Sequence, residues 1–200
     1  MSYDPPRPVG RLLLTPQDRE APARIERLRA LGLGERPEPA LDAFADRLAA
    51  RTRAPYAMVN LPGPHEQFYA GLHRPDRDVL DVDTPAPTTP AEDRDPSVTR
   101  RELGRRLARD HGFCPHVVAR RKALVLEDVR DYPRFAGNAI VDAFGIRSYL
   151  GAPLIDGTGT VLGTVCVVDV TPRPWGREGL RIIKAAAADL TRRLEHWPGP

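Results

Sequence analysis

Apolar residues recur at the spacing of an α-helix in three segments near the two ends of the chain. The first runs from Pro22, a residue type common in first helical turns, to Leu31. The second lies between Pro39 and Pro55, and the third covers residues 177–196. The apolar positions of the third form a seam of about two heptads: Leu180, Ile183, Ala187, Leu190 and Leu194. These patterns predict three amphipathic helices.

Runs rich in β-branched and aromatic residues predict strands in the middle of the chain. The predicted strands cover residues 56–61, 66–72, 123–127, 147–155 and 160–170. The last two surround a loop with two glycines and form the strongest hairpin pattern, so we expect them to be the central pair of the sheet. Shorter helices are predicted over residues 97–109, 115–121 and 138–144. This order is typical of an α+β domain with helices on one face of an antiparallel sheet.

Two segments lack both kinds of periodicity. Residues 1–20 have three prolines within their first eight positions, which exclude a regular helix, so we expect a flexible leader. Residues 74–96 carry seven acidic side chains and five prolines with almost no large apolar residue, a composition typical of a long exposed loop. We expect residues 21–197 to form a single domain that contains this acidic loop.

The composition excludes several classes of protein. The 200 residues include no apolar run of about 20 positions and no secretory signal, so we expect a cytoplasmic protein without membrane contact. The net charge is +3, but the basic residues of 100–122 form no single stripe and no aromatic residues alternate with them. A nucleic-acid partner is therefore not favoured. Two cysteines are too few for a disulfide framework or a structural zinc site, and we expect no metal.

Five segments carry a resemblance to a known family: residues 113–118 (FCPHVV), 124–128 (LVLED), 131–135 (DYPRF) with Asn138, 145–154 (GIRSYLGAPL) and 163–169 (GTVCVVD). With the last predicted helix, they resemble the GAF domains of bacterial signalling proteins. The resemblance covers about residues 22–195 and is most specific from residue 111 onward.

Resemblance to GAF domains implies a PAS-like antiparallel sheet. The terminal helices would lie on one face, and loops and short helices would cover a ligand pocket on the other. GAF domains are small-molecule and redox sensors that commonly dimerise through terminal helices. We therefore expect a stand-alone sensor module rather than an enzyme, acting as a homodimer or through a signalling partner. The cyclic-nucleotide signature and the bilin-attachment context of some relatives are absent, so the ligand and any cofactor stay unidentified.

The two thiols are candidates for redox chemistry. Cys114 and His116 lie two residues apart at the start of a helical turn, where they could share a proton and expose a thiolate. In the alternative interpretation both are packed side chains. Cys166 lies in an apolar strand and is expected to be packed. It could still form a disulfide with Cys114 if the two Cα atoms come within roughly 7 Å.

Charged and aromatic residues of the same region could line a ligand pocket. Arg147 or Arg134 could bind a carboxylate or phosphate, or these arginines could pair with Asp128 or Asp131 to hold a loop. The aromatic residues could form the apolar wall of the pocket or simply the core. The candidate ligand-binding residues are Phe113, Cys114, His116, Asp128, Phe135, Arg147 and Tyr149.

A second class of function is a thiol-dependent redox enzyme. Free methionine sulfoxide reductases share the GAF fold and use cysteines in the pocket. Cys114 and Cys166 are the only candidates in this chain, and their spacing does not resemble the cysteine pattern of those enzymes. The sensor interpretation is therefore preferred.

Overall fold

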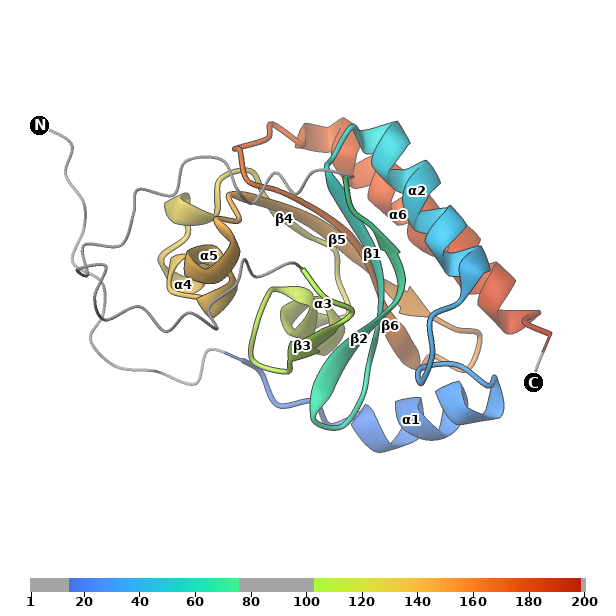
Figure 1. Cartoon of the computed structure of the whole chain (residues 1–200). Helices are drawn as coiled ribbons and strands as arrows, with labels where there is room; N and C mark the ends of the chain where they lie inside the picture. Colours follow the sequence, from blue (N-terminus) through green and yellow to red (C-terminus); the bar gives the residue numbers. More distant parts are fainter. Residues whose placement is uncertain (1–14, 76–102, 199–200) are drawn as a thin grey trace, which may run out of the picture.

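The structure is a computed structural model that describes residues 15–75 and 103–198. Its centre is a six-stranded antiparallel sheet with the order β3-β2-β1-β6-β5-β4 (Figure 1). The strands are β1 (Tyr56–Pro62), β2 (Glu66–His73), β3 (Arg106–Ala108), β4 (Leu124–Leu126), β5 (Ser148–Ile155) and β6 (Val161–Asp169). The predicted α+β class with an antiparallel sheet is confirmed.

Strands β1 and β6 form the middle of the sheet, and every residue of both is buried. In their antiparallel register Asn60 lies opposite Thr164, and Met58 lies opposite Cys166. β5 and β6 form the predicted hairpin. The expectation that this hairpin is the central pair is wrong, because β1 occupies the other side of β6 and leaves β5 next to the edge strand β4.

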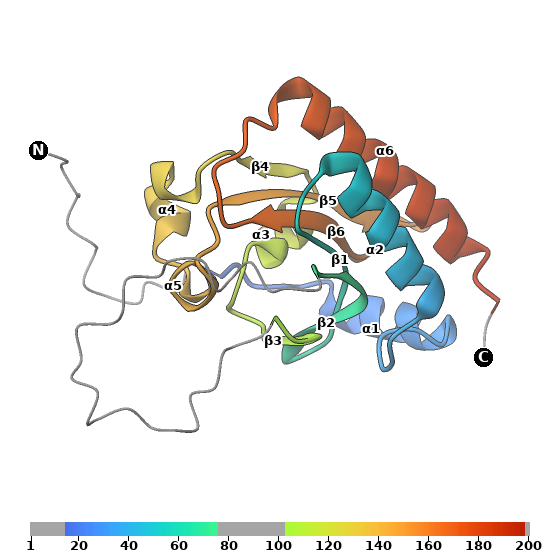
Figure 2. The ribbon, with the colours of Figure 1, turned by 45° about the horizontal axis from the view of Figure 1, so that its top comes forward.

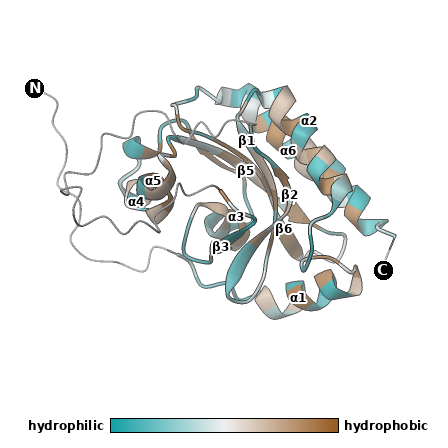
Figure 3. Ribbon diagram, viewed as in Figure 1, coloured by the Kyte–Doolittle hydropathy of each residue, from teal (hydrophilic) through white to brown (hydrophobic). Residues whose placement is uncertain are grey.

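Three helices cover one face of the sheet: α1 (Ala21–Ala30), α2 (Pro39–Thr52) and α6 (Gly176–Glu195). α2 and α6 lie side by side on this face, and α1 packs at its end (Figures 1 and 2). Hydrophobic and hydrophilic residues alternate along α6 (Figure 3). Four residues of the predicted seam lie in the core against the sheet: Ile183, Ala187, Leu190 and Leu194. The seam is therefore used within the domain.

Short helices cover the opposite face of the sheet. They are α3 (Cys114–Arg120), the 3₁₀ helix η3 (Val129–Asp131), α4 (Pro133–Ala136) and α5 (Ala139–Phe144). α3 contacts both β5 and β6. Asn138 begins α5 by accepting a hydrogen bond from the backbone N–H of Ile140 (3.1 Å). A second core, rich in aromatic residues and holding both thiols, lies between these helices and the sheet.

Arg24 connects α1 to the end of the sheet. Its side chain has no exposed surface, and its guanidinium donates hydrogen bonds to the backbone oxygens of Pro62 and Val161, each at 3.3 Å. Asp18 forms an ion pair with the same guanidinium. Burial lowers the pKa of Arg24 from 12.5 to about 10, so this group stays charged at neutral pH.

The helix predicted over residues 97–109 is wrong in its described part, because the edge strand β3 lies there. The backbone oxygen of Arg105 accepts a hydrogen bond from the backbone N–H of Tyr69 (2.8 Å). The Arg105 guanidinium pairs with Asp42 of α2 (2.9 Å). Pairing with the open edge of β2 satisfies backbone groups of both strands, and this outweighs the helical spacing of the leucines.

Two predictions concern segments that fall largely outside the described residues. The leader over 1–20 is described only from residue 15, and the acidic loop over 74–96 only at residues 74 and 75. Within the described ranges, no helix combines the length and the apolar character needed to cross a membrane.

Gly71 allows α2 to pack closely on β2. A Cβ atom at this position would overlap the backbone of Leu41. We expect Gly71→Ala to lower the free energy of unfolding by about 1–3 kcal/mol, because the helix must move away from the sheet. Urea denaturation of the two proteins measures this change.

Gly137→Ala is the matched control, because no atom of the described residues lies within 4 Å of the position that its Cβ would take. Its free energy of unfolding should change by less than about 0.5 kcal/mol. Equal stabilities of Gly71→Ala and the unmodified protein would contradict the close approach of α2.

Candidate functional site

The two cysteines meet between α3 and the sheet. Cys114 is the first residue of α3, where Pro115 begins the helical turn, and Cys166 lies on β6. Their sulfur atoms are 3.6 Å apart, and both are free thiols. The relative exposure is 4% for Cys114 and 0% for Cys166. The structure agrees with the expected packing of Cys166 in its strand, and Cys114, for which the sequence left two interpretations, is also buried. The two side chains face each other.

Tyr149 of β5 completes the group around the thiols. Its hydroxyl lies 3.4 Å from Cys114 Sγ. The ring extends over Gly151, which is the residue opposite Cys166 in the hairpin, and a Cβ atom at Gly151 would overlap the Tyr149 hydroxyl. Glycine at position 151 is therefore a condition for placing this hydroxyl beside the sulfurs.

The surroundings shift the pKa values of the two thiols in opposite directions. The hydrogen bond from Cys166 outweighs the opposing effect of burial and lowers the pKa of Cys114 from 9.0 to about 6. The side chains of Thr164, Tyr149 and Asn60 contribute smaller effects in the same direction. The hydrogen bond to Cys114 and burial raise the pKa of Cys166. Cys114 is therefore the more acidic thiol of the pair and the one that carries the negative charge when the pair loses a proton.

The Tyr149 hydroxyl remains protonated beside this charge. Burial, followed by the charge of the neighbouring thiols, raises its pKa well above the ordinary value of 10.0. A neutral phenol is a hydrogen-bond donor, and a thiolate is an acceptor. Tyr149 therefore stabilises the charged form of Cys114.

A buried polar row crosses the same face of the sheet beside the thiols, and we call its members, Gln67, Asn60 and Thr164, the polar row. Asn60 Nδ2 donates to Gln67 Oε1 (2.9 Å), and Gln67 Nε2 donates to the backbone oxygen of Ala108 (3.1 Å). Sequence analysis did not select these residues. The sequence does carry a signal for Asn60: it lies an even number of positions from Tyr56 and Met58, so it is a polar residue on the apolar side of β1.

Aromatic side chains surround the thiol pair. The ring centroids of Phe113 and Tyr149 are 5.2 Å apart, and those of Phe113 and Phe135 are 5.8 Å apart, in edge-to-face arrangements. The His116 ring packs against Phe135 at 5.0 Å. The five predicted site residues of this region, Phe113, Cys114, His116, Phe135 and Tyr149, are thus brought together as a packed, buried cluster.

His116 does not serve as a partner for the thiolate in this arrangement. Burial, followed by the charges of Arg134 and Arg120, lowers its pKa from 6.5 to about 4. The imidazole is therefore neutral at pH 7. The hypothesis that Cys114 and His116 share a proton is corrected by this geometry, because Cys114 contacts Tyr149 and Cys166 while His116 faces Phe135.

Asp128 and Arg147 form an ion pair with two hydrogen bonds, one of which joins Arg147 Nε and Asp128 Oδ1 at 3.0 Å. This pairing lowers the pKa of Asp128 and raises that of Arg147. Of the two alternatives that the sequence leaves open, the structure has the ion pair that holds the loop. The backbone oxygen of Arg147 also accepts a short hydrogen bond from Val129 N (2.6 Å).

Asn138 links the thiol region to α5. Its Oδ1 accepts a hydrogen bond from Gly112 N (2.8 Å), and its Nδ2 donates to Gly112 O (3.0 Å). Gly112 has a φ of 81°, a left-handed conformation that favours glycine. Asn138 therefore connects Gly112, two residues before Cys114, to the start of α5.

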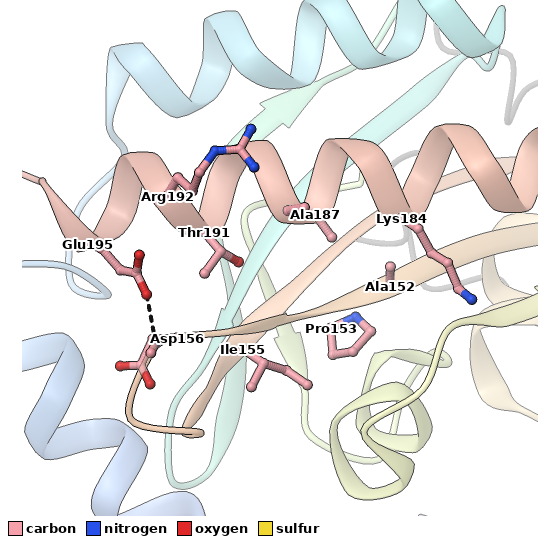
Figure 4. A pocket seen from close by; sticks show the side chains of 11 residues that line it. Ala152, Pro153, Ile155, Asp156, Lys184, Ala187, Thr191, Arg192 and Glu195 are labelled. Carbon is pink, nitrogen blue, oxygen red and sulfur yellow. Dashed lines mark hydrogen bonds between the residues drawn. The ribbon is translucent and has the colours of Figure 1, made fainter.

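Two surface cavities lie away from the thiol cluster. One, of about 440 Å³, lies between α6 and the end of β5, with Lys184 and Arg192 from the helix and Pro153 and Ile155 from the strand (Figure 4). The other, of about 430 Å³, lies between α1 and the β1–β2 turn. Neither is lined by any of the seven predicted ligand-binding residues. In the described part of the chain, no group of three metal-binding side chains occurs.

Comparison with known proteins identifies the family. The family model of the GAF domain matches residues 36–194, so the chain belongs to the GAF domain family. This fold is a sensor and ligand-binding fold. A search of curated proteins found no match.

Solved structures agree with the assignment. The GAF domain of the Acinetobacter phosphoenolpyruvate-protein phosphotransferase is 13% identical, with a TM-score of 0.54, covering 90% of this chain and 95% of its own. The free methionine-R-sulfoxide reductase of Neisseria meningitidis, in complex with its substrate, is 16% identical, with a TM-score of 0.53 and coverages of 78% and 75%. A far-red cyanobacteriochrome photoreceptor is 10% identical, with a TM-score of 0.58 and coverages of 88% and 94%. These likenesses show the fold.

Titration of the thiols tests the charge assignment. We expect the ultraviolet absorbance of thiolate in the reduced protein to rise with a midpoint at a pH of about 6 and this step to be absent in Cys114→Ser. In Cys166→Ala the midpoint should move to higher pH, because the S–H donor to Cys114 is removed. An unchanged midpoint in Cys166→Ala would contradict the assignment.

The neutral His116 predicts a dependence of stability on pH. Between the unfolded pKa near 6.5 and the folded pKa of about 4, the unfolded chain binds more protons, so stability falls as the pH decreases. We expect the free energy of unfolding to decrease between pH 7 and pH 5 by about 2 kcal/mol more than in His116→Phe. Parallel pH profiles of the two proteins in urea denaturation would show that folding does not lower the pKa of His116.

Proposed function

We propose that this chain is a redox-responsive GAF sensor module in which Cys114 and Cys166 interconvert between two thiols and a disulfide. The observation that carries this proposal is the separation of 3.6 Å between the two sulfur atoms. A disulfide bond is about 2.05 Å long, so the sulfurs need to approach by only about 1.5 Å. The inequality of the two pKa values supports the same function, because one thiol is a nucleophile while the other keeps its proton.

The proposed oxidation of the two thiols is a thiol–disulfide exchange. The Cys114 thiolate attacks a small-molecule disulfide, forms a mixed disulfide and releases one thiolate. The Cys166 thiol then loses its proton to that thiolate and attacks Cys114 Sγ, which releases the second half of the reagent as a thiolate. The reagent gains two electrons, and the protein gains one S–S bond. Reductants reverse both steps.

The signal has a structural route to the surface. Closing the disulfide draws the first turn of α3 toward β6, and Gly112 precedes this turn. Asn138 holds Gly112 by two hydrogen bonds and begins α5, so α5 responds to the position of Cys114. A conformational change of this kind alters output by shifting populations of the covering helices.

A bacterial homodimer or a signalling partner in the cytoplasm would read this change. Because the apolar seam of α6 is already buried against the sheet, a dimer formed through the terminal helices would use the outer, charged side of α6. Small-molecule binding between α3 and the sheet is less favoured than redox sensing, because aromatic side chains pack around the thiols.

The second candidate is a thiol-dependent enzyme related to the free methionine sulfoxide reductases. The same pair of close sulfurs supports it, since reduction of a sulfoxide uses a nucleophilic thiol and a second thiol that closes a disulfide. Consumption of free methionine sulfoxide by the protein with dithiothreitol, lost in Cys114→Ser, would favour the enzyme over the sensor.

Equilibration in defined ratios of reduced and oxidised glutathione tests the sensor. We expect intact-mass measurement to show one reversible loss of two hydrogens per chain, with no cross-linked dimer, because the two sulfurs lie within one chain. Cys114→Ser and Cys166→Ser should each lack this change. Retention of two free thiols across the whole series, or pairing between chains, would overturn the proposal.

A further inference from the structure

Two buried polar atoms beside the thiol pair have no hydrogen-bond partner among the described residues: Asn60 Oδ1 and Thr164 Oγ1. The two residues lie directly opposite each other on β1 and β6. Thr164 precedes Cys166 by two positions and therefore points to the same face. Neither residue has exposed surface. Because roughly 90% or more of buried polar groups in folded proteins are hydrogen-bonded, two unpaired neighbours point to a polar molecule that binds between them.

The network around Asn60 fixes the direction of its free oxygen. Asn60 Nδ2 is held by Gln67 Oε1, and the other end of the Gln67 amide donates to backbone oxygens of residues 108 and 111. Rotation of the Asn60 amide would place its oxygen against the Gln67 oxygen. The site therefore offers one fixed acceptor at Asn60 and one hydroxyl at Thr164, which can donate or accept.

The location of these two atoms limits the kind of molecule that can bind to them. Thr164 lies two positions before Cys166 on the same face of β6, Asn60 lies opposite Thr164, and Cys166 Sγ is 3.6 Å from Cys114 Sγ, so both polar side chains lie on the face that holds the two sulfurs. Phe113 and Tyr149 pack at 5.2 Å on the same cluster and limit the space available. A molecule that binds here must be small, must carry oxygen atoms that both donate and accept hydrogen bonds, and must meet a nucleophilic sulfur.

We propose that Asn60 and Thr164 bind the oxygen atoms of a small hydroperoxide, with hydrogen peroxide as the simplest member, and direct it onto Cys114 Sγ. This inference rests on the proposed function, because it names the oxidant of the same thiol pair. Asn60 Oδ1 accepts a hydrogen bond from a peroxide O–H, and the Thr164 hydroxyl donates to the oxygen that leaves. The developing negative charge on that oxygen makes the second hydrogen bond stronger in the transition state.

The reaction balances with peroxide as the only oxidant. The Cys114 thiolate attacks one oxygen, the S–O bond forms, the O–O bond breaks, and hydroxide leaves. The hydroxide takes the proton of Cys166 to form water. The resulting Cys166 thiolate attacks Cys114 Sγ, the S–S bond forms, and the S–O bond breaks to release a second hydroxide, which takes a proton from solvent. The two sulfurs lose two electrons, and peroxide becomes two molecules of water.

The test compares two reagents on the reduced protein. Iodoacetamide alkylates the Cys114 thiolate without transferring oxygen, so its rate depends on the fraction of thiolate and on the accessibility of the sulfur. The rate of reaction with hydrogen peroxide depends on these two properties and, in addition, on the binding of the peroxide oxygens. We expect Thr164→Val to lower the ratio of the peroxide rate to the iodoacetamide rate by about tenfold, because the donor to the leaving oxygen is lost. Thr164→Ser, which keeps the hydroxyl, should restore the ratio to near that of the unmodified protein.

Ser148→Ala is the matched control variant. Ser148 Oγ is also buried and has no hydrogen-bond partner within residues 15–75 and 103–198, but Ser148 lies next to Tyr149 in β5 and therefore on the opposite face, away from the thiols. A ratio that is unchanged in Thr164→Val, or equally reduced in Ser148→Ala, overturns the hydroperoxide site.

Failure of the inference differs from failure of the proposed function. If the disulfide forms in the glutathione series while Thr164→Val reacts normally with peroxide, the redox switch stands and the hydroperoxide site is wrong. If no disulfide forms in either experiment, both are wrong.

Discussion

The antiparallel pairing of β1 with β6 is the constraint on which the rest of the structure depends. Every residue of both strands is buried, so both faces of the sheet must be covered. One face receives α1, α2 and α6 through an aliphatic core, and the other receives α3, α4 and α5 through a core with thiols and aromatic rings. The register places Asn60 opposite Thr164 and brings Cys166 two positions further along the second face. The position of the candidate site is therefore a consequence of this one pairing.

A charge on Cys114 is costly in such a place, and the surrounding groups offset the cost. Burial alone disfavours a thiolate, yet the hydrogen bond from Cys166 and the side chains of Thr164, Tyr149 and Asn60 together lower the pKa of Cys114. These side chains come from β1, β5 and β6. The charged sulfur is thus stabilised only when β1, β5 and β6 are assembled, which couples the chemistry of one side chain to the integrity of the whole sheet.

Much of the fold could be predicted from the sequence. Long apolar periodicities, such as the seam of α6, and the β5–β6 hairpin are local patterns, and both are confirmed by the structure. Strand β3 could not be predicted, because the open edge of β2 that it satisfies belongs to a distant part of the chain. The central place of β1 was also missed, since strand order depends on contacts between elements far apart in sequence.

The candidate site could also be predicted only in part. Cys114, Phe113 and Tyr149 could be selected from their residue types and from the resemblance to GAF domains. The sequence left open whether Cys166 approaches Cys114, because their distance depends on the packing of α3 against β6. Asn60 and Thr164 were missed, since a polar residue in an apolar strand has meaning only when its opposite neighbour is known.

Crystal structures of the reduced protein and of the protein oxidised by glutathione disulfide test the central claim most directly. The account predicts continuous density between Cys114 Sγ and Cys166 Sγ in the oxidised crystal, an unchanged β1–β6 pair, and a displaced first turn of α3 with Asn138 and α5 following it. Two separate sulfurs in the oxidised crystal, or a disulfide with α3 and α5 in their reduced positions, would contradict it.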